Sequence, residues 1–265
     1  MLERGSESNA DHVFLDLEDS VAPNQKVESR GVVVKALNDF DWSGKIACVR
    51  VNGLDTEWGH QDARAVVEMR PDAVLLPKVN SADDLDALAE ITGDLPIWAM
   101  METPQGMLRA EEIAAHPKLA GFVMGTNDLA KDLQCRFRAD RLPLMASLGL
   151  CLLAAKAHGV VIVDGVYNAF KDDDGLRSEC QQGRDMGMDG KTLIHPAQVA
   201  IANELFAPSG EDIDLAGRQI AAFEEAEAKG QGVAVVDGRI VENLHVATAR
   251  EILAKAEAIA ALSSE

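Results

Sequence analysis

The sequence has few aromatic residues, few basic residues and no long apolar run. Only 4% of its residues are Phe, Trp or Tyr, and 25 Lys and Arg stand against 44 Asp and Glu, a formal net charge of −19. This excess of negative charge repels phosphate backbones and anionic lipids, so we expect neither a nucleic-acid nor a membrane partner. A small anionic substrate is compatible with it, because a few cations and a metal ion can reverse the potential inside a cleft.

Cysteine is scarce, and several common motifs are missing. The four cysteines lie far apart without a C-x-x-C pair, which argues against structural zinc and a disulfide framework and favours free thiols in a reducing cytoplasm. The polar start of the chain does not resemble a signal peptide. No G-x-G-x-x-G, Walker A or G-x-S-x-G motif gives local support to dinucleotide binding, P-loop hydrolysis or serine hydrolase chemistry.

Short apolar runs recur along the chain and alternate with helical patterns. Continuous apolar runs of this length are typical of strands buried on both faces of a parallel sheet, and the alternation predicts an α/β fold. The length of 265 residues fits one (β/α)8 barrel, although we count seven strands. The expected strands are His12–Leu17, Ile46–Val51, Ala73–Val79, Ile97–Met101, Gly121–Met124, Val160–Val163 and Thr192–Ile194.

The last part of the chain departs from this alternation. We expect a long amphipathic helix over Glu211–Lys229, a short strand or hairpin over Gln231–Arg239, and a final helix from about Val241 to Leu262. We therefore divide the chain into a barrel-like catalytic domain, 1–207, and a C-terminal helical extension, 208–265. We expect this extension to pack on the barrel or on a neighbouring subunit.

Polar residues follow the expected strands, where active groups of a barrel gather. Glu102 and Asp128 follow adjacent strands, so their carboxylates can converge. Two carboxylates, completed by water and substrate oxygens, are a typical protein contribution to a Mg²⁺ site. Alternatively, each acid is a helix cap or first-turn acid that needs no metal.

Arg50 is embedded in an apolar strand, where an unpaired charge is costly. Its guanidinium suits a substrate carboxylate, or it forms an ion pair with Asp16 or Glu18 across the barrel; the two roles are compatible. Asp16, Glu18 and Asp19 form an acidic cluster that can hold metal-bound water or cap the next helix. Lys78 can pair with these acids; alternatively, it forms a Schiff base.

Six ordered segments resemble the HpcH/HpaI aldolase and citrate lyase family, most closely its citrate lyase β-subunit-like branch of malyl-CoA and citramalyl-CoA lyases. The similarity covers nearly the whole chain. The segments are 14–23 (FLDLEDSVAP), 49–52 (VRVN), 75–79 (LLPKV), 101–106 (METPQG), 125–130 (GTNDLA) and 190–196 (GKTLIHP).

The resemblance implies Mg²⁺ held by Glu102 and Asp128, and a keto-acid carboxylate held by Arg50. It also implies that Asp237, in the segment 235–239 (VVDGR), acts as general acid/base in a neighbouring subunit's site, within a homotrimer or hexamer. Alternatively, Asp237 is a turn residue, because Asp-Gly is a common hairpin pair.

The implied reaction is cleavage of a 3-hydroxyacyl thioester of CoA or an acyl carrier, of the malyl, citramalyl or citryl type, to acetyl-CoA and a 2-keto acid. The alternatives are a CoA-independent metal aldolase that uses pyruvate and a catalytically silent subunit or scaffold. Family members normally begin with a further strand and an Arg-Ser-x-Leu-x-x-Pro-Gly loop, so we expect the first barrel strand to be missing from this chain.

Overall fold

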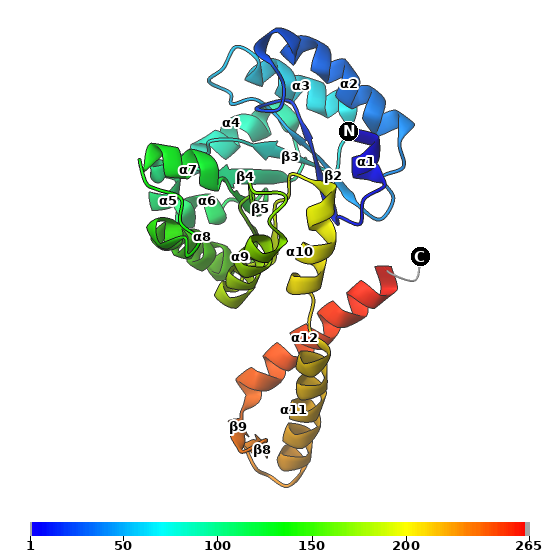
Figure 1. Cartoon of the computed structure of the whole chain (residues 1–265), viewed down its shortest axis with the longest axis vertical. Coiled ribbons are helices and arrows are strands. Elements are labelled where there is room, and N and C mark those ends of the chain that lie inside the picture. Colours follow the sequence, from blue (N-terminus) through cyan, green and yellow to red (C-terminus); the bar gives the residue numbers. More distant parts are fainter. Residues whose placement is uncertain (1, 263–265) are drawn as a thin grey trace. The chain divides into compact units, whose positions relative to one another are not determined.

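The computed structural model describes residues 2–262, and its first part is a curled parallel sheet surrounded by helices (Figure 1). Seven strands pair in sequence order, all parallel, with β1 and β7 at the two edges. They are β1 (His12–Asp16), β2 (Ile46–Arg50), β3 (Ala73–Leu76), β4 (Ile97–Met101), β5 (Leu119–Met124), β6 (Val161–Asp164) and β7 (Gly190–Lys191). The expected seven-stranded, barrel-like α/β fold is confirmed.

Helices connect successive strands and cover the outer face of the sheet (Figure 1). The chain divides into two compact units, Met1–Ala202 and Asn203–Glu265. The helices are α1 (Leu2–Ser6), α2 (Lys26–Asp39), α3 (Gly59–Met69), α4 (Ala82–Thr92), α5 (Pro104–Leu108), α6 (Ala110–Ala114), α7 (Thr126–Asp132), α8 (Met145–His158), α9 (Asp173–Met186), α10 (Val199–Phe206), α11 (Gly210–Ala228) and α12 (Asn243–Leu262). None of the helices within residues 2–262 is long and apolar enough to cross a membrane.

The strands bury both faces, as their continuous apolar sequences predict. Successive side chains of a strand point to opposite faces, so each strand contributes side chains to two packed layers. A cluster of Cys48, Leu75, Trp98, Met100 and Val123, with partners from the same sheet, forms one of them. Most of the alternate residues of β2–β5 are also fully or almost fully buried, which explains why no polar alternation marks these strands.

Three local features define where helices and strands of the first unit begin and end. Ser81 and Asp84 form a capping box at the start of α4. The segment after β4 forms two short helices and not one, because Arg109 adopts φ −114° and ψ 16° and separates α5 from α6. The last strand is Gly190–Lys191 rather than Thr192–Ile194, since β6 ends at Asp164, which pairs with Lys191.

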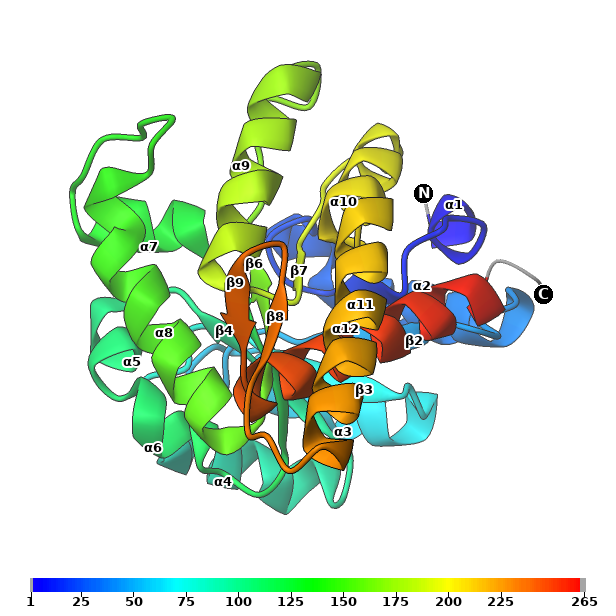
Figure 2. The same cartoon turned by 90° about the horizontal axis from the view of Figure 1, so that it is seen from below.

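The second unit consists of α11, α12 and a hairpin of β8 (Ala234–Val236) and β9 (Arg239–Val241), seen from below in Figure 2. Its core includes Phe223, Val241 and Val246. The hairpin turn is Asp237–Gly238, with φ of 49° and 73°. Two positive φ values are what a type I′ turn requires, so the expected Asp-Gly hairpin is confirmed.

Candidate active site

The polar groups at the C-terminal edge of the sheet lie on its interior face. Asp16 ends β1, Arg50 ends β2 and Glu102 follows β4. Arg50 lies two residues beyond Cys48, and Glu102 two beyond Met100, both members of the interior cluster. Because the side-chain period of a strand is two, these charged groups point into the mouth of the barrel above its apolar core. The sheet therefore brings together residues that are far apart in the sequence.

Asp16 and Arg50 form a two-pronged ion pair. The two residues are in register on neighbouring strands, and Arg50 Nε and Nη2 donate to the two carboxylate oxygens of Asp16 at 2.7 and 2.6 Å. Burial alone would raise the pKa of Asp16, but the hydrogen bonds and charge of Arg50 outweigh it and lower the pKa to about 2. The expected ion pair is therefore present, and it fixes the plane of the guanidinium.

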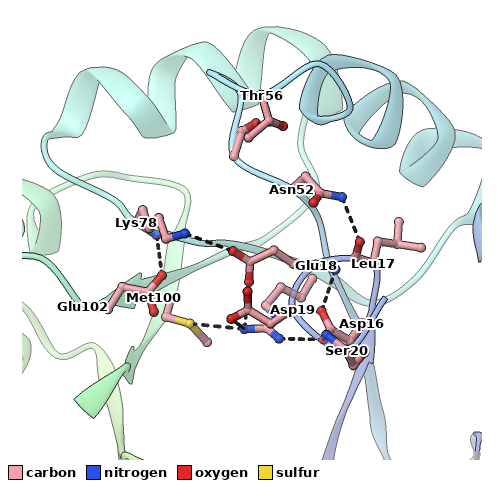
Figure 3. Close-up of polar contacts among 12 residues, drawn as sticks. Asp16, Leu17, Glu18, Asp19, Ser20, Asn52, Thr56, Lys78, Met100 and Glu102 are labelled. Atoms are coloured by element: carbon pink, nitrogen blue, oxygen red, sulfur yellow. Dashed lines mark hydrogen bonds and ion pairs between the residues drawn. The ribbon is translucent and has the colours of Figure 1, made fainter. Parts of the chain in front are cut away.

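Glu18 lies between the two cations of the site (Figure 3). Its Oε2 is 2.9 Å from Arg50 Nη1, and its Oε1 is 3.6 Å from Lys78 Nζ. Burial raises the pKa of Glu18 although Arg50 acts in the opposite direction. Asp19 is more exposed, with Oδ2 at 3.8 Å from Arg50 Nη1.

Glu102 is the most perturbed carboxyl of the group. It is 2% exposed and accepts a 2.8 Å hydrogen bond from the backbone N–H of Lys78. Burial, followed by the charge of Glu18, raises the pKa of Glu102 to about 8. A Cβ on Gly125 would lie 2.4 Å from Glu102 Cβ and 2.5 Å from its Oε2, so a glycine is required beside this side chain.

Asp128 completes the pair of acids expected to bind metal. It lies in the first turn of α7, half-buried, and its charge contributes to the raised pKa of Glu102. Across residues 2–262, no three His, Cys, Asp or Glu side chains are grouped as a ready-made metal cage. A metal held here would take two carboxylates from the protein and its other ligands from water and substrate, as Mg²⁺ usually does.

Asp237 belongs to the second unit, and the structure gives it a local partner. Its Oδ2 accepts a 2.7 Å hydrogen bond from Arg218 Nη1, and Arg218 Nε also donates to Asp214 at 2.8 Å. All three side chains are well exposed. The acid/base role of Asp237 stays a prediction, as does its contribution to a neighbouring subunit.

Sequence reasoning missed a buried polar network behind the site. Lys26 Nζ donates to the carbonyls of Leu17 and Glu18 at 3.1 and 2.6 Å and to Asn52 Oδ1 at 2.8 Å. Asn52 in turn donates to Asp62, which is fully buried. This network anchors the loop that carries Glu18. Asn52, the polar residue directly after an apolar strand, was the available signal.

A second missed network lies at the ends of β6 and β7. Arg141 Nη1 donates to both oxygens of the fully buried Asp164 at 2.7 Å. Lys191 Nζ donates to Glu179 Oε1 and to the carbonyl of Gly165, both at 2.6 Å. Arg141 lies in a polar loop far from any expected strand, so no pattern could have paired it with Asp164.

Comparison with protein families and known proteins gives consistent matches. Residues 1–196 match the family model described as HpcH/HpaI aldolase/citrate lyase, and residues 143–260 match that of a C–C bond lyase of the TIM-barrel fold. The (3S)-malyl-CoA thioesterase of Cereibacter sphaeroides is 64% identical over 260 residues, which cover 98% of this chain and 91% of that protein.

A more distant relative and a solved structure agree with these matches. The L-malyl-CoA/beta-methylmalyl-CoA lyase of Cereibacter sphaeroides is 34% identical, over 98% of this chain and 92% of that protein. The protein CitE from Mycobacterium tuberculosis, solved in complex with magnesium, acetoacetate and coenzyme A, is similar in fold. It has a TM-score of 0.81 and 31% identity, covering 94% of this chain and 90% of that chain.

Proposed function

Because the chain belongs to the HpcH/HpaI aldolase/citrate lyase family, whose members include lyases and thioesterases, we propose that it hydrolyses (3S)-malyl-CoA to malate and free CoA with Mg²⁺. One observation carries the choice of hydrolysis: the (3S)-malyl-CoA thioesterase is 64% identical over 98% of this chain, whereas the lyase is 34% identical. Cleavage of the carbon–carbon bond, which the resemblance alone favoured, becomes the second candidate.

The donor set at the barrel mouth fits Mg²⁺. Glu102 and Asp128 would hold the ion, because hard carboxylate oxygens are its preferred protein ligands. Burial and neighbouring negative charge raise the pKa of Glu102 to about 8, and a divalent cation would relieve both effects. Magnesium is also present in the solved complex of the similar CitE protein. When bound, Mg²⁺ supplies Lewis-acid polarisation of substrate oxygens.

Arg50 would hold the free carboxylate of the malyl group. Asp16 takes the Nε–H and one Nη2–H of Arg50, so the second Nη2–H stays available to an incoming anion. The ion pair with Asp16 locks the guanidinium plane, which reduces the entropy lost when a carboxylate binds. Arg50 ends β2 and Glu102 follows β4 on the same interior side. Arg50 and a Mg²⁺ held by Glu102 can therefore bind two ends of a small hydroxy acid.

The hydrolysis balances without a further reagent. The oxygen of water forms a bond to the thioester carbonyl carbon, and the carbon–sulfur bond breaks. The thiolate leaves with its electron pair and takes one proton of the water, which yields a carboxylate, free CoA thiol and one proton in solution. Positioned charges that stabilise the intermediate oxyanion are the main contribution expected of the protein.

Cleavage of the carbon–carbon bond is the second candidate. Residues 143–260 match the model of a C–C bond lyase, and the 34% identical relative is a lyase for malyl-CoA. The same substrate would then give acetyl-CoA and glyoxylate, with the negative charge developing on the same thioester oxygen. For this reaction the predicted acid/base is Asp237, within the predicted homotrimer or hexamer.

The test separates the two reactions by their products. The purified chain is mixed with (3S)-malyl-CoA and either Mg²⁺ or EDTA, and free thiol, acetyl-CoA and keto acid are measured in parallel. Hydrolysis releases free thiol without keto acid, whereas carbon–carbon cleavage releases glyoxylate without free thiol. We expect Mg²⁺-dependent thiol release that the Glu102→Gln variant lacks. Glyoxylate without thiol would replace the hydrolase by the lyase, and no turnover would favour the silent subunit or the CoA-independent aldolase.

A further inference from the structure

Lys78, at the mouth of the barrel, has a strained backbone conformation. It has φ of 54°, in the left-handed region that non-glycine residues rarely adopt. Such conformations persist where the surroundings impose them, and they are concentrated at functional sites. The residue follows β3 and Pro77, at the C-terminal edge where Arg50 and Glu102 also lie.

The backbone of Lys78 is held from both sides. Its N–H donates to Glu102 Oε1 at 2.8 Å, and its carbonyl accepts from Asn80 Nδ2 at 2.9 Å. Asn80 is itself fixed, because its Oδ1 accepts a 2.6 Å hydrogen bond from Thr103 Oγ1. A Cβ on Gly106 would lie 2.2 Å from the carbonyl oxygen of Val79, so α5 packs directly on this loop. The strained conformation is therefore imposed by neighbours that belong to the next strand and helix.

The side chain of Lys78, in contrast, makes one long ion pair, with Glu18, and no hydrogen bond among the described residues. Its Nζ lies 3.6 Å from Glu18 Oε1, beyond hydrogen-bond distance. The side chain is 53% exposed, at the mouth of the barrel (Figure 3). The partner it approaches, Glu18, is already contacted by Arg50 at 2.9 Å. The clamped backbone thus places an ammonium group at the mouth of the barrel with its donors not used in hydrogen bonds. A structural ion pair with Glu18 would not require this clamped, left-handed conformation.

We propose that Lys78 is a catalytic residue whose ammonium group donates a hydrogen bond to the thioester carbonyl oxygen of the substrate. This role rests on the proposed function, since it assumes a thioester in the site. Negative charge develops on that oxygen when water attacks the carbonyl carbon, and it returns to the carbon–oxygen double bond when the thiolate leaves. Lys78 gives up no proton and forms no covalent bond. In carbon–carbon cleavage the same oxygen would carry the enolate charge.

The experiment compares three substitutions at one position in the full-length chain. Lys78→Met removes the charge and keeps the length, Lys78→Arg keeps a charge, and Lys78→Gly removes the side chain while suiting the left-handed backbone. Lys156→Met is the matched control, because Lys156 is similarly exposed (47%) and forms a 2.7 Å ion pair with Asp189. For each variant, kcat, KM, Mg²⁺ affinity and melting temperature are measured, and Lys78→Gly is assayed with and without butylamine.

We expect kcat of Lys78→Met to fall by about 10²–10³-fold, the usual loss for an oxyanion donor, with KM and Mg²⁺ affinity within about 3-fold of wild type. Lys78→Arg should keep about 10-fold more activity than Lys78→Met, and butylamine should restore part of the activity of Lys78→Gly. A raised KM at unchanged kcat, or loss of activity in step with loss of Mg²⁺ binding, would overturn the role. If the wild type hydrolyses the thioester and Lys78→Met is unimpaired, the role of Lys78 is wrong but the proposed function stands. A wild-type chain without thioester turnover overturns the proposed function as well.

Discussion

Replacement of Asp16 by Asn should destabilise the chain by about 2 kcal/mol at pH 7. The pKa of Asp16 falls from 3.8 to about 2 through its pairing with Arg50, and each pKa unit corresponds to about 1.4 kcal/mol. The side chain of Asp16 is only 16% exposed, so solvent screening reduces this figure little. About 2 kcal/mol corresponds to a fall in melting temperature of roughly 4–8 °C for a chain of this size.

The stability that Asp16 contributes should decrease as the pH falls. A depressed folded-state pKa contributes stability that is fully present above the unfolded pKa of 3.8 and is lost as pH falls towards 2. The difference in unfolding free energy between wild type and Asp16→Asn, measured by urea denaturation, should be constant from pH 5 to 8 and fall to roughly half near pH 3. Asp19→Asn is the control, because Asp19 is 63% exposed and 3.8 Å from Arg50. A loss equal to that of Asp19→Asn would refute the reasoning.

Three further predictions concern the acids of the two units. Gly125→Ala should weaken Mg²⁺ binding by at least about 10-fold in titration calorimetry, because its Cβ would displace Glu102, whereas Gly149→Ala, where a Cβ meets nothing within 4 Å, should not. Since Glu102 must lose a proton to bind metal, Mg²⁺ affinity should rise by about one log unit per pH unit from pH 6 to 8 and then level off; a flat profile would contradict the pKa of about 8. If Asp237 is an acid/base, Asp237→Asn should lower kcat by about 10²-fold or more without a change in melting temperature. Asp214→Asn, whose carboxylate shares the same arginine, should leave kcat unchanged.

The strands were predictable because both faces of this sheet are buried. Parallel strands covered by helices on one side and a filled interior on the other are apolar over most of their length, so short apolar runs located six of the seven strands. The last run was placed two residues too late, because the end of β7 depends on where β6 stops and not on its own composition. Helix ends with a side-chain cap, such as Ser81, were predictable, whereas the break at Arg109 was not.

The position of the site was predictable from the sequence, whereas its side-chain contacts were not. All strands of a parallel sheet end at one edge, so the polar residues after each run had to meet. The sequence left open whether Arg50 pairs with an acid. In the structure, Asp16 is its partner because the two residues are in register on neighbouring strands. The left-handed backbone of Lys78 could not be predicted, because it is imposed by Glu102 and Asn80 from other segments and not by its own residue type.

The burial of Glu102 works against stability and therefore needs a functional explanation. A folded-state pKa of about 8 against 4.5 destabilises the metal-free chain progressively above pH 4.5, by roughly 3 kcal/mol at pH 7. Glu102→Gln removes this penalty and keeps an acceptor for the N–H of Lys78. We expect the variant to be more stable than the metal-free wild type in urea denaturation, and to gain nothing from added Mg²⁺. A destabilised variant would mean that Glu102 serves the fold, whereas a stabilised, inactive one would show that the chain gives up stability to keep an unpaired carboxylate for a cation.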